Sequence, residues 1–96
     1  MIRVEGERLY VSGAATLATA AQLIEEARGP LEAGVSAIDL GEVTELDSSL
    51  LAVLFAWLRA ARERQRPLAL VRLPPDLKSL AQLYGVAELL QEEPAR

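Results

Sequence analysis

The sequence predicts a single α/β domain built on a small, mostly parallel sheet, and two observations support this fold class. Short segments rich in β-branched and apolar residues alternate along the chain with segments of helical periodicity. Strand–helix–strand order requires crossover connections, which make consecutive strands parallel and place the helices against the sheet. The chain has 96 residues, of which 51% are hydrophobic and 25% are charged, a balance typical of one globular domain.

The first two elements are expected to be the strands of a β-hairpin. Residues Ile2–Glu5 and Leu9–Ser12 alternate β-branched or aromatic side chains with polar ones, and Gly6-Glu7 between them indicates a turn. Gly13 is expected to end the second strand.

A helix should follow the hairpin, because apolar residues recur at helical spacing after Thr16, a residue type that caps helix N-termini. The pair Gly29-Pro30 is expected to end this helix. The residues expected to face the core are Leu17, Ala20, Ala21, Ile24 and Ala27.

The middle of the chain predicts a further strand and a second helix. Val35–Leu40 has the pattern of a buried strand closed by Gly41, and the acidic segment Glu42–Asp47 is expected to be a loop. A helix is expected over Leu50–Gln65 and should end before Pro67.

The last third predicts one more strand and helix. Leu68–Leu73 is expected to be a strand, and a third helix should begin after Pro74-Pro75 and end at Gly85. Val86–Leu90 is expected to add a short element. We therefore place the domain at residues 1–91 and a frayed C-terminal tail at 92–96. The apolar stripe of the third helix is expected to comprise Leu77, Leu80, Ala81 and Tyr84.

The composition argues against several classes of function. The chain contains no Cys and no His, which removes the usual thiolate nucleophile, the commonest general base and the commonest metal ligands. Its net charge of −4 disfavours nucleic-acid binding and direct insertion into an anionic membrane. The first residues are acidic and lack the apolar run of a secretory signal. We expect a soluble cytoplasmic protein that is not an enzyme and holds no metal or cofactor.

Two clusters of charge have a functional and a structural interpretation. The acidic residues Glu42, Glu45 and Asp47 are the kind of ligands that bind a hard cation, but they also suit a solvated loop before a helix N-terminus. A basic cluster at the end of the second helix suits either an acidic partner or the negative end of the helix dipole. We favour the structural interpretation for both. The basic cluster comprises Arg59, Arg62, Arg64 and Arg66.

Two features exceed what the fold requires and define the candidate site. Asp47, Ser48 and Ser49 precede the second helix, although one capping residue would suffice. The segment Leu50–Leu58 is apolar at every position, whereas a surface helix needs only one apolar face. We expect an exposed apolar flank beside the hydroxyls, forming a partner-binding surface. Its apolar members are expected to be Leu50, Val53 and Trp57, with neighbouring helices covering them as the alternative.

These features resemble a STAS domain, a small sheet with four or five strands and helices packed mainly on one side. The resemblance covers nearly the whole chain and is most specific over residues 43–90. It rests on the order of elements, the loop into Asp47-Ser48-Ser49, the apolar helix after it and the segment Leu80–Val86. Leu50 stands where many members of the family carry Gly.

The resemblance is greatest to the MlaB-like subunit of the Mla-type ABC system, which maintains lipid asymmetry of the Gram-negative outer membrane. The similarity lies in the short length, the Trp57-Leu58-Arg59 pattern and the Leu83–Leu90 ending. It implies an adaptor that binds the cytoplasmic ATPase subunit, and through it a permease at the inner membrane. Ser48 occupies the family position implicated in that contact.

Anti-sigma-factor antagonists are also similar, and they imply a different function. In those proteins the second hydroxyl residue of the triplet is phosphorylated by a serine-kinase anti-sigma factor. Ser49 occupies that position here. We prefer the adaptor, because it needs a persistent apolar and hydroxyl surface, which is what the sequence is expected to provide.

Overall fold

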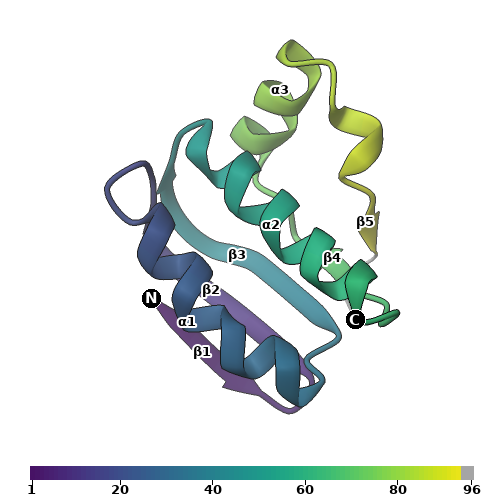
Figure 1. The fold of residues 1–96 in the computed structure, drawn as a ribbon. Coiled ribbons are helices and arrows are strands. Elements are labelled where there is room, and N and C mark those ends of the chain that lie inside the picture. The colour runs from purple at the N-terminus through teal and green to yellow at the C-terminus, as the bar shows by residue number, and fades with distance from the viewer. Residues whose placement is uncertain (94–96) are drawn as a thin grey trace.

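Five strands form one sheet, and the helices pack against one of its faces (Figure 1). The computed structural model describes residues 1–93. The strands are β1 (Ile2–Glu5), β2 (Arg8–Ala15), β3 (Ala37–Leu46), β4 (Ala69–Val71) and β5 (Glu92–Glu93). The helices are α1 (Ala20–Ala33), α2 (Ser49–Glu63) and α3 (Pro75–Leu83), with a short 3-10 turn, η1 (Ala87–Leu89).

The strands follow one another across the sheet in chain order. β1 is antiparallel to β2, and each of the other neighbouring pairs is parallel. The predicted α/β class, the N-terminal hairpin and the mostly parallel sheet are therefore confirmed. No helix within residues 1–93 has the length and apolar character that a membrane crossing would need.

The long central strands differ from the prediction, because both continue beyond the glycines expected to end them. β2 passes through Gly13 and β3 passes through Gly41 into the segment predicted as an acidic loop. Parallel pairing of these extensions, up to Ala15 opposite Leu46, satisfies their backbone groups. Gly13 has a φ of 80° between two register shifts, a conformation that glycine adopts without steric cost.

The first helix also differs at both ends. It begins after Thr19 instead of Thr16, and the Thr16 N–H donates to the Thr19 hydroxyl at 3.0 Å. It continues through Pro30, because Leu31 in the last turn is buried in the core. The helix ends at Gly34, whose φ of 109° is the left-handed conformation of a glycine C-terminal cap.

The C-terminal segment is ordered further than expected at Glu92 and Glu93, which pair with β4 as β5. The Glu92 carboxylate accepts the Leu73 N–H at 2.8 Å and forms an ion pair with Lys78 at 2.7 Å. These two contacts explain why residues 92 and 93 join the sheet. The rest of the predicted tail, 94–96, lies outside the described residues.

The core lies between the sheet and the helices. Alternate residues of β2 and β3, such as Leu9 and Ile38, are fully buried beneath the helices. One face of each helix completes the same cluster. The helical residues with the deepest burial are Leu23, Ala27, Leu50, Leu54 and Leu77.

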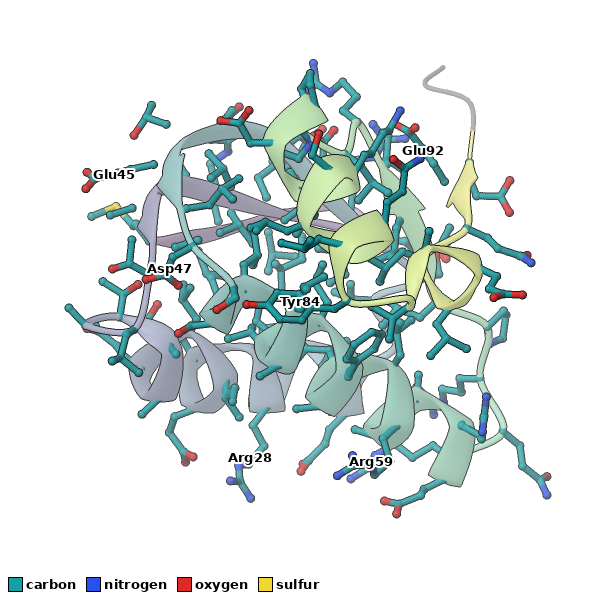
Figure 2. The ribbon with its side chains drawn as sticks, turned by 90° about the horizontal axis from the view of Figure 1, so that it is seen from above. Arg28, Glu45, Asp47, Arg59, Tyr84 and Glu92 are labelled. Atoms are coloured by element: carbon teal, nitrogen blue, oxygen red, sulfur yellow. The ribbon has the colours of Figure 1, made fainter. Side chains whose placement is uncertain are left out.

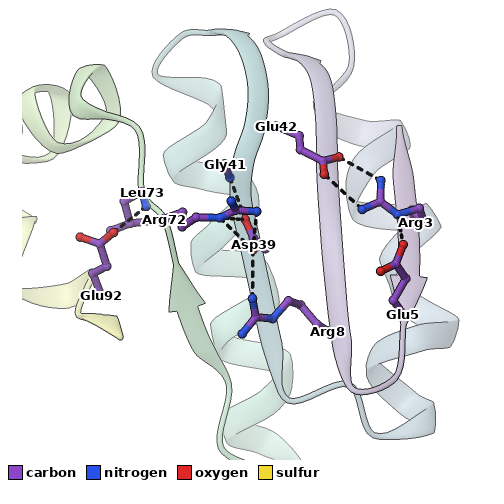
Figure 3. Close-up of polar contacts among 9 residues, drawn as sticks. All are labelled: Arg3, Glu5, Arg8, Asp39, Gly41, Glu42, Arg72, Leu73 and Glu92. Atoms are coloured by element: carbon purple, nitrogen blue, oxygen red, sulfur yellow. Dashed lines mark hydrogen bonds and ion pairs between the residues drawn. The ribbon is translucent and has the colours of Figure 1, made fainter. Parts of the chain in front are cut away.

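On the opposite face of the sheet, a buried carboxylate on β3 links this strand to its two neighbours (Figure 3). Asp39 on β3 is fully buried and receives charged contacts from Arg8 at 3.2 Å and Arg72 at 2.9 Å. The Gly41 N–H also donates to it at 2.9 Å. Burial acts to raise the pKa of Asp39, but the hydrogen bonds from Arg72 and Gly41 and the nearby positive charges outweigh it and lower the pKa.

Gly41 is required for this arrangement by close approach. A Cβ atom at position 41 would lie 2.7 Å from Arg72 Nε, which is inside van der Waals contact. Arg72 can therefore reach Asp39 only because the neighbouring strand position has no side chain. The ion pairs of Asp39 with Arg8 and Arg72 thus connect β3 to β2 and to the end of β4.

We predict that Asp39→Asn destabilises the domain by about 1–3 kcal/mol at neutral pH, because it weakens the hydrogen bonds of a buried group. A lowered pKa means that the carboxylate contributes stability above its unfolded pKa of about 3.9, and loses it as the pH falls through the lower folded value. Denaturant unfolding at several pH values should show the difference from wild type shrinking in acid. A difference that does not change with pH would contradict this origin.

Candidate functional site

Asp47 fixes the start of α2. Its carboxylate accepts the Ser49 N–H at 2.8 Å and the Leu17 N–H at 3.1 Å. The first bond satisfies a free amide of the helix N-terminus, and the second joins the segment before α1 to the start of α2. The N–H groups of Leu17 and then Ser49 lower the pKa of Asp47, so this side chain is ionised at neutral pH.

The Ser48 hydroxyl is not used to cap α2 and is available for other contacts. It is exposed at the N-cap position of α2, and its hydroxyl makes no capping hydrogen bond within the described chain. Asp47 performs the capping instead, so the helix does not need the Ser48 side chain. Ser49, the first residue of α2, is half-buried.

An open groove begins at these residues and extends along α3. Its volume is about 460 Å³, and it places Ser48 on the same surface as Leu83 and Tyr84. Leu83 is 76% exposed and Tyr84 is 58% exposed. Figure 2 shows Tyr84 extending over α2 from the end of α3. The groove, called here the α2–α3 groove, is lined by Leu46, Asp47, Ser48, Asp76, Ser79, Leu80, Leu83 and Tyr84.

The structure contradicts the expected exposed flank of α2. Leu50, Val53 and Trp57 are at most 2% exposed and belong to the core. The alternative interpretation, that neighbouring helices cover these residues, is correct. The sheet lies beneath α2, and α1 and α3 cover the two flanks of α2. The structure thus brings together Asp47, Ser48 and Ser49 at the surface and places the three apolar residues beneath it.

Three exposed apolar side chains near the site are not predicted by the sequence analysis. They are Leu17, Leu83 and Tyr84. The sequence predicts Tyr84 in the core stripe of the third helix and Leu17 on the core face of the first helix, yet Leu17 is 77% exposed. The later start of α1 leaves Leu17 in the preceding segment. Leu83 and Tyr84 stand at the end of α3, directly before Gly85. Local periodicity does not signal the exposure of Tyr84, because this residue lies three positions after Ala81 and seven after Leu77, both of which are buried.

The order of the strands, the helices on one face and the surface at the start of α2 define the class of protein as a STAS domain. The chain belongs to the MlaB-type STAS family: a family model described as "Mlab, STAS domain" matches residues 2–91. The resemblance stated from the sequence is therefore confirmed. Comparison with curated proteins gives no match.

Solved structures agree on the fold. The anti-sigma factor antagonist SpoIIAA in its unphosphorylated form superposes with a TM-score of 0.72 at 13% identity, over 100% of this chain and 87% of that one. The Bacillus cell fate determinant SpoIIAA in its phosphorylated form gives 0.68 at 13% identity, over 100% and 90%. A protein from Thermotoga maritima, described as a candidate anti-sigma factor antagonist, gives 0.75 at 15% identity, over 100% and 86%.

We predict that Asp47→Ala lowers the thermal midpoint and speeds amide hydrogen exchange at Leu17 and Ser49, because both N–H groups lose their acceptor. Asp47→Asn keeps one acceptor oxygen and should have a smaller effect. Exchange rates measured by NMR for wild type and both variants test this. Unchanged protection at both amides in Asp47→Ala would show that the carboxylate does not hold the two segments together.

Proposed function

We propose that this chain is a non-catalytic adaptor that binds the ATPase subunit of a Mla-type phospholipid-transport ABC complex and supports its assembly and activity. The observation that carries the proposal is the exposed Ser48 hydroxyl, unused by its own helix, beside the exposed Leu83 and Tyr84 in one open groove. Membership of the MlaB-type family supports this choice of partner. The protein would then act in the cytoplasm, held at the inner membrane through the ATPase and its permease.

The physical basis is that adjoining exposed apolar side chains indicate an interaction surface, and Leu83 and Tyr84 are adjacent and line one groove. Tyr and Leu in a groove supply buried area, and a hydroxyl at its edge supplies orientation through hydrogen bonds. Asp47 sets the geometry of the helix start and lines the groove. Ser49, which is half-buried and does not line the groove, would make a secondary contact. Leu50, Val53 and Trp57 act from beneath, by keeping α2 in position.

A second candidate function is that of an anti-sigma-factor antagonist switched by phosphorylation of Ser49. The observation in its favour is that Ser49 is the first residue of α2, where the partial positive charge of the helix N-terminus favours a phosphate. The ionised Asp47 beside it would oppose the added charge. Mass spectrometry of native protein tests this function: phosphate on Ser49 together with a co-purifying serine kinase would favour it over the adaptor.

We predict that Ser48→Arg weakens binding to the ATPase subunit by about tenfold or more, about 1.4 kcal/mol, because a bulky charge then occupies the edge of the contact. Ser48→Ala is the matched variant and should weaken binding less than Ser48→Arg, since it removes one exposed hydroxyl from the contact without adding bulk or charge, and it should leave the fold unchanged because the hydroxyl makes no capping bond. Co-purification from gently solubilised membranes and titration with the purified ATPase measure this effect.

Circular dichroism and thermal midpoints should show that both Ser48 variants fold like wild type. Full retention of the ATPase by a folded Ser48→Arg variant would rule out this surface as the contact.

A further inference from the structure

The surface around the start of α2 carries negative charge only. A second groove adjoins the α2–α3 groove and shares Leu46 and Asp76 with it. Besides these two shared residues, its lining consists of Val43, Thr44, Glu45, Pro74 and Pro75, of which only Glu45 is charged. The two grooves together contain Glu45, Asp47 and Asp76, and no Arg or Lys of residues 1–93 lines either of them.

This charge is not neutralised within the described chain. Glu45 and Asp76 take part in no ion pair among residues 1–93, in contrast to the acidic residues of the sheet face, where Glu42 pairs with Arg3 at 2.9 Å. The nearest basic residue of α3, Lys78, faces away from the groove and pairs with Glu92. Three carboxylates without a basic neighbour therefore frame an apolar floor.

We propose that the segment that docks here is a basic and apolar one: an apolar side chain seated against Leu83 and Tyr84, flanked by Arg or Lys that pair with Asp76 and Glu45. This inference rests on the proposed function, because it specifies the docking segment of the ATPase. Charge complementarity selects this occupant over an anionic lipid surface, which the three carboxylates would repel. It also selects against an acidic peptide for the same reason.

The chemistry of the contact has a measurable consequence. Exposed pairs of opposite charge speed and orient association, and salt screens them over a distance of about 10 Å at 0.1 M. Binding of the ATPase should therefore weaken when salt is raised, and the acidic residues should account for this dependence. Leu83 and Tyr84 should contribute a part that salt does not weaken.

The test is titration of the purified ATPase subunit with wild type and with the double variant Glu45→Lys/Asp76→Lys at low and high NaCl, about 50 and 300 mM. The double variant should bind at least about tenfold more weakly at low salt, and its binding should no longer weaken when salt is raised, because the basic segment now meets Lys and salt screens this repulsion. The matched control is Glu63→Lys, the same change at the exposed last residue of α2, which should bind within about twofold of wild type.

Wild-type affinity for the double variant, or binding that salt does not affect, would overturn the charge assignment while leaving the adaptor function intact. A short helical peptide with Leu and Arg, and a copy with Glu in place of Arg, provide an arm that does not depend on the ATPase. NMR shifts at Ser48, Leu83 and Tyr84 should appear with the Arg peptide alone, and equal or absent shifts with both would also overturn the inference. Failure of the ATPase to bind wild type at any salt would count against the proposed function instead.

A second copy of this chain is the other occupant to test, because its exposed arginines at the C-terminal end of α2 could pair with the acidic residues of the groove. Sedimentation of the isolated protein distinguishes it. Self-association that the double variant abolishes would replace the ATPase segment with another copy and overturn the proposed occupant. A monomer across the measured concentrations supports it.

Discussion

The burial of the large apolar side chains in the first half of α2 determines which surface the domain presents near this helix. An α-helix that is apolar on all sides must be covered on all sides, and here the sheet lies beneath it while α1 and α3 cover its flanks. Burying the Trp57 side chain removes a large apolar area from water, which stabilises by about 1.5–3 kcal/mol, offset in part because its buried indole N–H has no hydrogen-bond partner among residues 1–93. The large apolar side chains of the helix are therefore used within the core, and the exposed apolar surface nearest its N-terminus comes from the end of α3, at Leu83 and Tyr84.

Two carboxylates with different surroundings secure this geometry. Asp39 is buried beneath two arginines on the far face of the sheet and links three strands, whereas Asp47 is half-buried and links two chain segments through backbone N–H groups. Both have a lowered pKa, because each is surrounded by donors that prefer the charged form. Acid should therefore weaken the sheet face and the start of α2 together. The candidate site is built on ionised groups that the fold itself stabilises.

The fold class and the position of the site can be predicted from the sequence, but the composition of the surface cannot. Periodicity locates the three helices and the first four strands, although not all of their ends, and the Asp47-Ser48-Ser49 triplet marks the start of α2, because these patterns are local. Whether Trp57 or Tyr84 is exposed depends on which helices flank α2, which is a tertiary property. The same holds for β3, whose last residues resemble a loop alone and become a strand by pairing with β2.

The distribution of charge along α2 gives the proposed docking site a direction. The N-terminal end is framed by Glu45, Asp47 and Asp76, whereas exposed arginines follow the C-terminal half, including Arg59 and Arg62. Acids near the start and bases near the end both complement the helix dipole, so the arrangement also suits the stability of the helix. A basic partner is attracted to one end of this helix and repelled from the other. Because the α2–α3 groove lies at the acidic end, long-range attraction of a basic segment and short-range packing against Leu83 and Tyr84 favour the same orientation, which promotes fast and specific association between two proteins.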